Sequence, residues 1–154
     1  MPDIVDSATR SRMMSGIRGR DTKPEILIRK GLFRHGFRYR LHVRNLPGKP
    51  DLVLARYHAV VLIHGCFWHG HDCRLFKWPS TNDEFWQKKI GRNRERDCEV
   101  RNLLKKEGWR VLTIWECSFR GKGSDGLEQV VQRAADWIRS DKRTGTIRGK
   151  RCGR

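Results

Sequence analysis

One stretch organises the chain: the apolar run Ala59-Val60-Val61-Leu62-Ile63 leads directly into His64-Gly65-Cys66-Phe67-Trp68-His69-Gly70-His71-Asp72-Cys73. A short run of β-branched and aliphatic residues that stops before a glycine predicts a largely buried β-strand. The ten residues after it hold two cysteines, three histidines, two large aromatic residues and one aspartate. Because a loop leaving a buried strand can bring side chains together, we expect a metal or substrate site there.

Two interpretations of the cysteines and histidines in this loop are open. In the first, the cysteines are small apolar core residues and the histidines are buried polar residues with hydrogen-bond partners, as such residues often are. In the second, Cys66, His71 and Cys73 are ligands of a tetrahedral zinc ion, which thiolate and imidazole together suit. The spacing is not that of a familiar zinc finger, so the argument for zinc, which we favour, needs a fourth ligand from elsewhere.

The order of the predicted elements supplies that ligand. A capping-box sequence at residues 81–84 opens a long helix that ends before Gly108, and the apolar residues 110–115 predict the next strand. A strand–helix–strand crossover makes its two strands parallel, and parallel neighbours end at the same edge of a sheet. Cys117 is therefore expected beside Cys66. Four ligands leave no open position on the metal, so this zinc is expected to be structural.

The other elements complete an α/β prediction. A second capping box, residues 22–25, opens a helix that stops at Gly36, and a strand is expected at residues 37–43. A rigid turn at residues 46–50 leads into a strand at 51–54, and the short polar connection after it brings Asp51 opposite residues 62–64. Further helices are expected at 7–17 and 126–138. The basic tail from Ser140 onward is expected to be disordered, as a solvated arm or an extra nucleic-acid contact.

The charge of the chain points to a polyanionic partner. Its 154 residues, one domain by length, contain 34 Lys and Arg against 17 Asp and Glu, which gives a net charge of +17. No apolar run reaches membrane-spanning length and the N-terminus lacks the layout of a signal peptide, so we expect a cytoplasmic protein that binds nucleic acid. Five cysteines without an export signal argue against a disulfide framework. Cys98 and Cys152 are interpreted as free thiols.

The remaining polar groups near the loop offer hydrolytic chemistry. His64 and His69 are not needed for zinc, and Asp51 lies across the hairpin. An acid that holds Mg²⁺ beside a histidine that takes a proton from water makes a workable phosphodiesterase site. Asn93 and Asp97 share a helix face, and Glu25 lies in the first turn of its helix; residues in such positions are more often caps or surface groups.

Four motifs of the chain closely resemble the very short patch repair (Vsr) endonucleases. The motifs are residues 47–51 (PGKPD), 64–73 (HGCFWHGHDC), 84–90 (EFWQKKI) and 115–117 (WEC), and the resemblance runs from about Ala8 to Gly121. It implies a restriction-endonuclease-like core with a central mixed sheet flanked by helices. It also implies a Mg²⁺-dependent nick 5′ to the thymine of a T:G mismatch that arises when 5-methylcytosine deaminates, the first step of very short patch repair.

The resemblance also implies roles for the site residues. Asp51 becomes the Mg²⁺ ligand and His69 the general base. The structural zinc ligands become Cys66, His71, Cys73 and Cys117. Supporting roles fall to Glu25, His64, Asn93 and Asp97. The residues that enter or bind DNA become Met14, Phe67, Trp68, Trp86 and Lys89.

The chain departs from the wider nuclease pattern at one point. After Pro50-Asp51, an acid, a spacer and a lysine are expected on the next strand, but Ile63-His64-Gly65 stands there. The backbone carbonyl of Ile63 then becomes the second Mg²⁺ contact, and a histidine has to handle the water.

The resemblance further implies how the chain is organised and what it works with. Residues 1–20 are expected to be a DNA-contacting arm, 21–139 the endonuclease domain and 140–154 a tail. The expected partners are duplex DNA with a T:G mismatch, a functionally linked cytosine-5 DNA methyltransferase and general mismatch-repair proteins, with the chain acting as a monomer. Two alternatives stay open: a zinc-stabilised DNA-binding module without catalysis, and an ordinary restriction endonuclease that cuts both strands.

Overall fold

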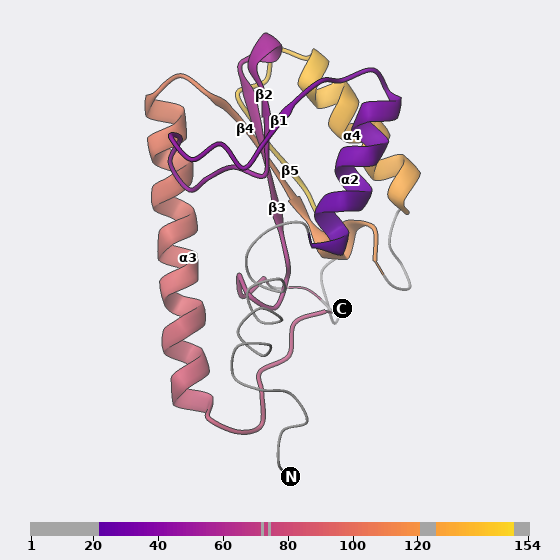
Figure 1. The fold of residues 1–154 in the computed structure, drawn as a ribbon. Coiled ribbons are helices and arrows are strands. Elements are labelled where there is room, and N and C mark those ends of the chain that lie inside the picture. The colour runs from indigo at the N-terminus through magenta and orange to yellow at the C-terminus, as the bar shows by residue number, and fades with distance from the viewer. Residues whose placement is uncertain (1–21, 72, 74, 121–125, 150–154) are drawn as a thin grey trace, which may run out of the picture.

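The computed structural model describes residues 22–71, 73, 75–120 and 126–149, which form one mixed sheet with helices on both faces (Figure 1). The strands are β1 (Arg40–Leu41), β2 (Leu52–Leu54), β3 (Ala59–His64), β4 (Arg110–Trp115) and β5 (Thr144–Ile147), in that order across the sheet. The helices are α2 (Lys23–Arg34), α3 (Asp83–Lys106) and α4 (Leu127–Arg139). The predicted DNA-contacting arm, with Met14, lies outside the described residues. Within the described part, no helix is both long and apolar enough to cross a membrane.

Strand β3 is the centre of the sheet, as its apolar sequence predicts. It pairs antiparallel with β2 and parallel with β4. All its residues are buried. Successive side chains point to opposite faces: Val61 and Ile63 belong to the core under α2 and α4, whereas Val60 and Leu62 belong to the core under α3. The predicted parallel crossover is confirmed, and it brings the ends of β3 and β4 to one sheet edge.

The ends of several elements differ from the prediction. The strand expected at residues 37–43 is reduced to β1, two residues long. Thr22 is the N-cap of α2, but its side chain makes no capping hydrogen bond. At α3 the N-cap is Asn82, in a left-handed conformation, instead of Thr81. Neither capping box forms as expected, and the side chain of Glu25 is buried.

The basic segment after α4 forms a strand, which corrects the expectation of a disordered tail from Ser140 onward. β5 pairs in parallel with β4, with Ile147 opposite Ile114. Ile147 is buried in the core, and the indole N–H of Trp137 donates to the carbonyl of Thr144 (3.0 Å). Three of the four residues of β5, Thr144, Thr146 and Ile147, are β-branched and so typical of a strand, but Gly145 and the surrounding Lys and Arg residues obscured this pattern in the sequence.

The guanidinium of Arg110 ties β5 to the end of α4. It donates at 2.8–3.3 Å to the carbonyls of Tyr57, Trp137, Ile138, Ser140 and Lys142. It also lies 4.5 Å from the centroid of the Trp137 ring. A cation among the last carbonyls of a helix satisfies them and interacts favourably with the helix dipole. One side chain therefore closes the C-terminus of α4 and positions the chain that enters β5.

Replacing Arg110 by methionine is expected to lower the free energy of unfolding by about 2–3 kcal/mol, because several half-buried carbonyls lose their donor. Urea unfolding followed by tryptophan fluorescence measures the effect. Lys106→Met, which removes the same charge from an exposed position in the last turn of α3, is the matched control and should stay within about 0.5 kcal/mol of the wild type. Equal unfolding midpoints for the two variants would contradict this role of Arg110.

Candidate functional site

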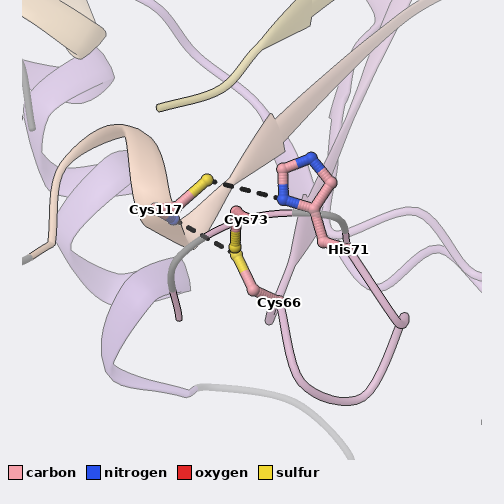
Figure 2. Close-up of side chains that lie close together, drawn as sticks. All are labelled: Cys66, His71, Cys73 and Cys117. Atoms are coloured by element: carbon pink, nitrogen blue, oxygen red, sulfur yellow. Dashed lines mark hydrogen bonds between the residues drawn. The ribbon is translucent and has the colours of Figure 1, made fainter. Parts of the chain in front are cut away.

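Four buried side chains converge where the ends of β3 and β4 meet (Figure 2). They are Cys66, His71, Cys73 and Cys117, and one ligand atom from each lies within 4.8 Å of the others. The backbone N–H of Cys117 donates to Sγ of Cys66 (3.3 Å), and Sγ of Cys117 lies 3.5 Å from Nδ1 of His71. The sequence-based grouping of these four residues is therefore confirmed as a cluster that could hold a metal ion.

The chemistry of this cluster suits a divalent cation. The nearby Cys117 thiol and then burial raise the pKa of Cys66, whereas the hydrogen bond from Cys66 lowers the pKa of Cys117 to about 4. The two shifts have opposite directions because two buried thiolates in contact would repel each other. A metal ion bound between the thiolates removes that repulsion. The ring of His71 is fixed by stacking on Trp115, with 3.9 Å between centroids and 4° between planes.

The turn between Cys66 and His71 is held by its backbone. The N–H of His71 donates to the carbonyl of Cys66 (2.9 Å), and Arg94 of α3 donates to the carbonyl of Gly70. Gly70 has a φ of +60°, and a Cβ there would overlap the side chains of Ile90 and Arg94. Glycine is required at this position both by the backbone conformation and by the close approach of α3.

Gly70→Ala is expected to destabilise the protein by about 1–3 kcal/mol, because a left-handed conformation and a steric overlap act together. Gly91→Ala is the matched control: it lies within α3 and a Cβ there meets nothing within 4 Å. The control should be neutral or stabilising by up to about 1 kcal/mol. Thermal unfolding of both variants measures the difference, and a Gly70→Ala protein as stable as the wild type would refute the requirement.

The second cluster lies at the start of β2. Oδ2 of Asp51 accepts a hydrogen bond from the N–H of Ile63 (2.7 Å), as the hairpin predicted. Burial, and then the nearby carboxylate of Glu25, raise the pKa of Asp51 to about 8. One ligand atom from each of Glu25, His42 and Asp51 lies within 4.8 Å of the others. Two carboxylates held this close in a desolvated place favour a bound cation between them.

A histidine–carboxylate pair lies across from these acids. Nδ1 of His69 is 2.6 Å from Oδ2 of Asp97, so the carboxylate orients the ring and favours the tautomer that carries its proton on Nδ1. The ring of His64 stacks on that of His69, with 3.9 Å between centroids. Burial first, and the charges around it second, hold the pKa of His64 well below its ordinary value, so His64 stays neutral. Asn93 donates to the carbonyl of Trp68 (2.7 Å) and secures the loop that carries His69.

The two groups face one cleft of about 1210 Å³. The sequence-predicted residues that line it are Glu25, Asp51, Ile63, His64, Phe67, Trp68, His69, Lys89, Asn93 and Asp97. The cationic residues along it are Lys23, Arg44, Lys49, Lys89, Arg96 and Arg120. Four carboxylates, those of Glu25, Asp51, Asp97 and Glu116, also line the cleft, so cationic side chains are in excess there, and an excess of positive charge attracts a polyanion.

The aromatic residues of the loop pack against each other. Phe67 contacts Trp68 and Trp86 edge-to-face, at 5.2 Å between centroids in each case, and all three are half-buried. Phe85, the neighbour of Trp86, is exposed, and Nζ of Lys89 lies 5.9 Å from its ring centroid. The cluster is thus neither core nor free in solvent, and it borders the cleft through Phe67 and Trp68.

Sequence reasoning missed His42, Trp115 and Arg101 as parts of the site. Trp115 stacks on His71 and meets His64 edge-on. Arg101 contributes to the lowered pKa of His64. The position of Trp115, two residues before a predicted ligand, was the one available signal. Cys98 is a free, exposed cysteine of α3, as predicted, and Cys152 lies outside the described residues.

Comparison with known proteins agrees with this geometry. A family model described as DNA mismatch endonuclease Vsr matches residues 2–75. The chain is 45% identical over 138 residues to DNA mismatch endonuclease Vsr of Escherichia coli (strain K12), covering 90% of this chain and 88% of that protein. It is 44% identical over 140 residues to Type II nicking enzyme V.NmeAIP of Neisseria meningitidis, covering 90% of this chain and 100% of that enzyme.

A buried cysteine–histidine cluster beside a histidine–carboxylate pair in a basic cleft, in a chain with these relatives, defines a DNA endonuclease. The chain belongs to the Vsr family of DNA mismatch endonucleases.

Proposed function

We propose that this chain is a Mg²⁺-dependent endonuclease that nicks DNA 5′ to the thymine of a T:G mismatch and so initiates very short patch repair. The observation that supports it best is the pairing of His69 with Asp97 in the cleft that also contains Asp51. The relatives named as a mismatch endonuclease and as nicking enzymes support action on mismatched DNA and a single-strand cut.

In the proposed reaction the chain holds a cation and moves one proton. Asp51 and the carbonyl of Ile63 would bind Mg²⁺, which when bound supplies charge stabilisation at the scissile phosphate. His69 accepts the proton of the attacking water at Nε2, and Asp97 stabilises the resulting imidazolium through Nδ1. His64, buried and neutral, supports the His69 ring without adding a positive charge next to it.

The proposed role of the Cys66–Cys117 cluster is structural. Three thiolates and one imidazole match a closed tetrahedral zinc site, which leaves no ligand position for substrate. The ion would join the ends of β3 and β4 and so fix the loop that carries His69. A restriction-endonuclease-like core, with a mixed sheet between α3 on one face and α2 and α4 on the other, is proposed with it (Figure 1).

Mismatch selectivity is proposed to come from Phe67, Trp68 and Trp86. Inserting rings between base steps costs a few kcal/mol of unstacking, least where pairing is already weak. A T:G wobble pair is such a place. Met14 and Lys89 would add contacts to the grooves and backbone of the DNA.

Four further expectations stay predictions. They are the link to a cytosine-5 DNA methyltransferase, the link to mismatch-repair proteins, the monomeric state and the domain limits.

A nicking assay on T:G and T:A duplexes, with and without Mg²⁺, tests this function. We expect a nick in the thymine-containing strand of the T:G duplex and only when Mg²⁺ is present. The other strand and the T:A duplex should stay intact. Cleavage of both strands of a T:A duplex would instead identify an ordinary restriction endonuclease. Tight duplex binding without any cleavage would identify a zinc-stabilised binding module.

His69→Ala is expected to slow the nick by about 10²–10⁴-fold, because it removes the general base. Asp97→Asn keeps the shape of the pair but favours the wrong tautomer of His69, so a smaller loss in the same direction is expected. Duplex affinity should stay within about threefold of the wild type for both variants, since neither change removes a phosphate contact. Single-turnover cleavage and a binding titration measure the two quantities, and full activity of His69→Ala would remove it from the mechanism.

A further inference from the structure

His42, which no sequence pattern singled out, lies beside the acidic pair of the cleft. Its Nε2 is 3.4 Å from Oε2 of Glu25, and the two side chains are only 12% and 6% exposed. A ligand atom of Asp51 lies within 4.8 Å of both. All three residues line the cleft that contains His69. Two carboxylates and one imidazole therefore converge at the start of β2.

The backbone of His42 is held in an uncommon conformation. Its φ is +49°, in the left-handed region, directly after β1 ends at Leu41. A non-glycine residue there costs about 1–3 kcal/mol and persists where the surroundings hold it. The conformation turns the chain after β1 and places the imidazole beside Glu25. Such strain is often found where a side chain must be held at a ligand.

The 3.4 Å between Nε2 of His42 and Oε2 of Glu25 is close to the spacing of neighbouring ligands on a single six-coordinate cation. With bonds of about 2.1 Å, neighbouring ligand atoms are about 3 Å apart and opposite ones about 4.2 Å. Mg²⁺ prefers oxygen ligands and keeps several waters. Imidazole is a ligand of first-row transition ions, and among them Mn²⁺ also suits carboxylate and water. A site with two carboxylates and one imidazole is thus better matched to Mn²⁺ than to Mg²⁺.

We propose that His42 is a direct ligand of the cation held by Asp51 and Glu25, and that it makes this site bind Mn²⁺ more tightly than Mg²⁺. The inference rests on the proposed function, because it concerns the same cation site. It goes further in adding Glu25 and His42 to the ligands Asp51 and the Ile63 carbonyl, and in naming the metal preference that the imidazole produces. The simplest rival is an ion pair in which protonated His42 only orients Glu25.

The test measures Mn²⁺ binding to the full, zinc-loaded chain by the loss of the free Mn²⁺ signal in electron paramagnetic resonance. His42→Gln keeps an N–H donor for Glu25 but removes the imidazole. We expect its Mn²⁺ dissociation constant to rise about tenfold, and its Mg²⁺ constant, measured by displacement of Mn²⁺, to change less than about threefold. Pulsed measurements should show ¹⁴N coupling to bound Mn²⁺ in the wild type and not in the variant.

Two further variants guard the experiment. His42→Asn tolerates the left-handed backbone well and should give the same loss of ¹⁴N coupling if His42→Gln folds poorly. His58→Gln is the matched control, because His58 also has a positive φ (51°) but is stacked on Trp109, away from the acidic pair. The control should bind both cations as the wild type does.

The outcomes separate this inference from the proposed function. If His42→Gln keeps the ¹⁴N coupling, or weakens Mn²⁺ and Mg²⁺ equally, His42 is not a selective ligand and the inference fails. Asp51→Asn tests the cation site itself. If this variant binds neither Mn²⁺ nor Mg²⁺, the proposed cation site at Asp51 is supported even where His42 proves not to be a ligand. Wild-type binding of both cations by Asp51→Asn would place the cation elsewhere and overturn both proposals.

Discussion

An Asp51→Asn variant is expected to nick a T:G duplex about 10⁴-fold more slowly than the wild type at saturating Mg²⁺, since the metal contributes several kcal/mol of transition-state stabilisation. The change is a matched one, because the asparagine Oδ1 can still accept the hydrogen bond that Asp51 takes from the N–H of Ile63. The strand end should keep its shape, and duplex affinity should be close to normal. Single-turnover cleavage of a labelled duplex gives the rate.

The control for this variant is Asp136→Asn, which removes the same charge from an exposed position on α4. Its cleavage rate should equal that of the wild type. If Asp51→Asn keeps a rate within about tenfold of the wild type, the Mg²⁺ ligand lies elsewhere in the cleft, because loss of a metal ligand costs more than this.

The same variant has a second, opposite effect on stability in the absence of divalent cations. Burial, and then the Glu25 carboxylate, raise the pKa of Asp51 from 3.8 to about 8. Between these values the folded state keeps a proton that the unfolded state has released, so the free energy of unfolding falls as the pH rises through this window. Asparagine cannot ionise, so the variant should melt at a higher temperature than the metal-free wild type at pH 8. The difference should shrink below pH 4 and when Mg²⁺ is added.

The features that sequence analysis predicted well depend on local pattern and on topology. The burial of β3 along its whole length follows from its apolar run, and the parallel order of β3 and β4 follows from the crossover through α3. Those two facts were sufficient to bring Cys117 to Cys66, although 51 residues separate them in the chain. The short hairpin placed Asp51 opposite Ile63 for the same kind of reason.

The features that it missed depend on how separate elements pack. Glu25 lies beside Asp51 because of the position at which α2 packs on the sheet. No motif in the sequence of α2 predicts that position. His42 reaches them through a single left-handed residue. β5 was hidden by charge, and its docking depends on the carbonyls gathered around Arg110. Each of these is a tertiary contact that overrides the local propensity.

The Cys117→Ser variant is expected to lose the bound metal and much of the stability of the fold. Sγ of Cys117 lies 3.5 Å from Nδ1 of His71 and accepts a hydrogen bond from the N–H of Gly149 (3.2 Å). The backbone N–H of Cys117 donates to Sγ of Cys66. Cys117 thus connects the loop after β3, the turn after β4 and the chain that leaves β5. Serine is a poor zinc ligand and a shorter side chain, so all three connections weaken together.

The free energy of metal binding adds directly to the folding free energy in a closed site of this kind, where zinc-finger peptides gain about 10–16 kcal/mol. Purified wild-type protein should therefore contain about one zinc per chain, and Cys117→Ser should contain almost none and unfold at a much lower temperature. Cys98→Ser is the matched control, because Cys98 is exposed on α3 and outside the cluster. Elemental analysis and thermal unfolding measure both properties. Wild-type protein that is stable without zinc would refute a structural metal, whereas full zinc content in Cys117→Ser would remove Cys117 from the ligand set.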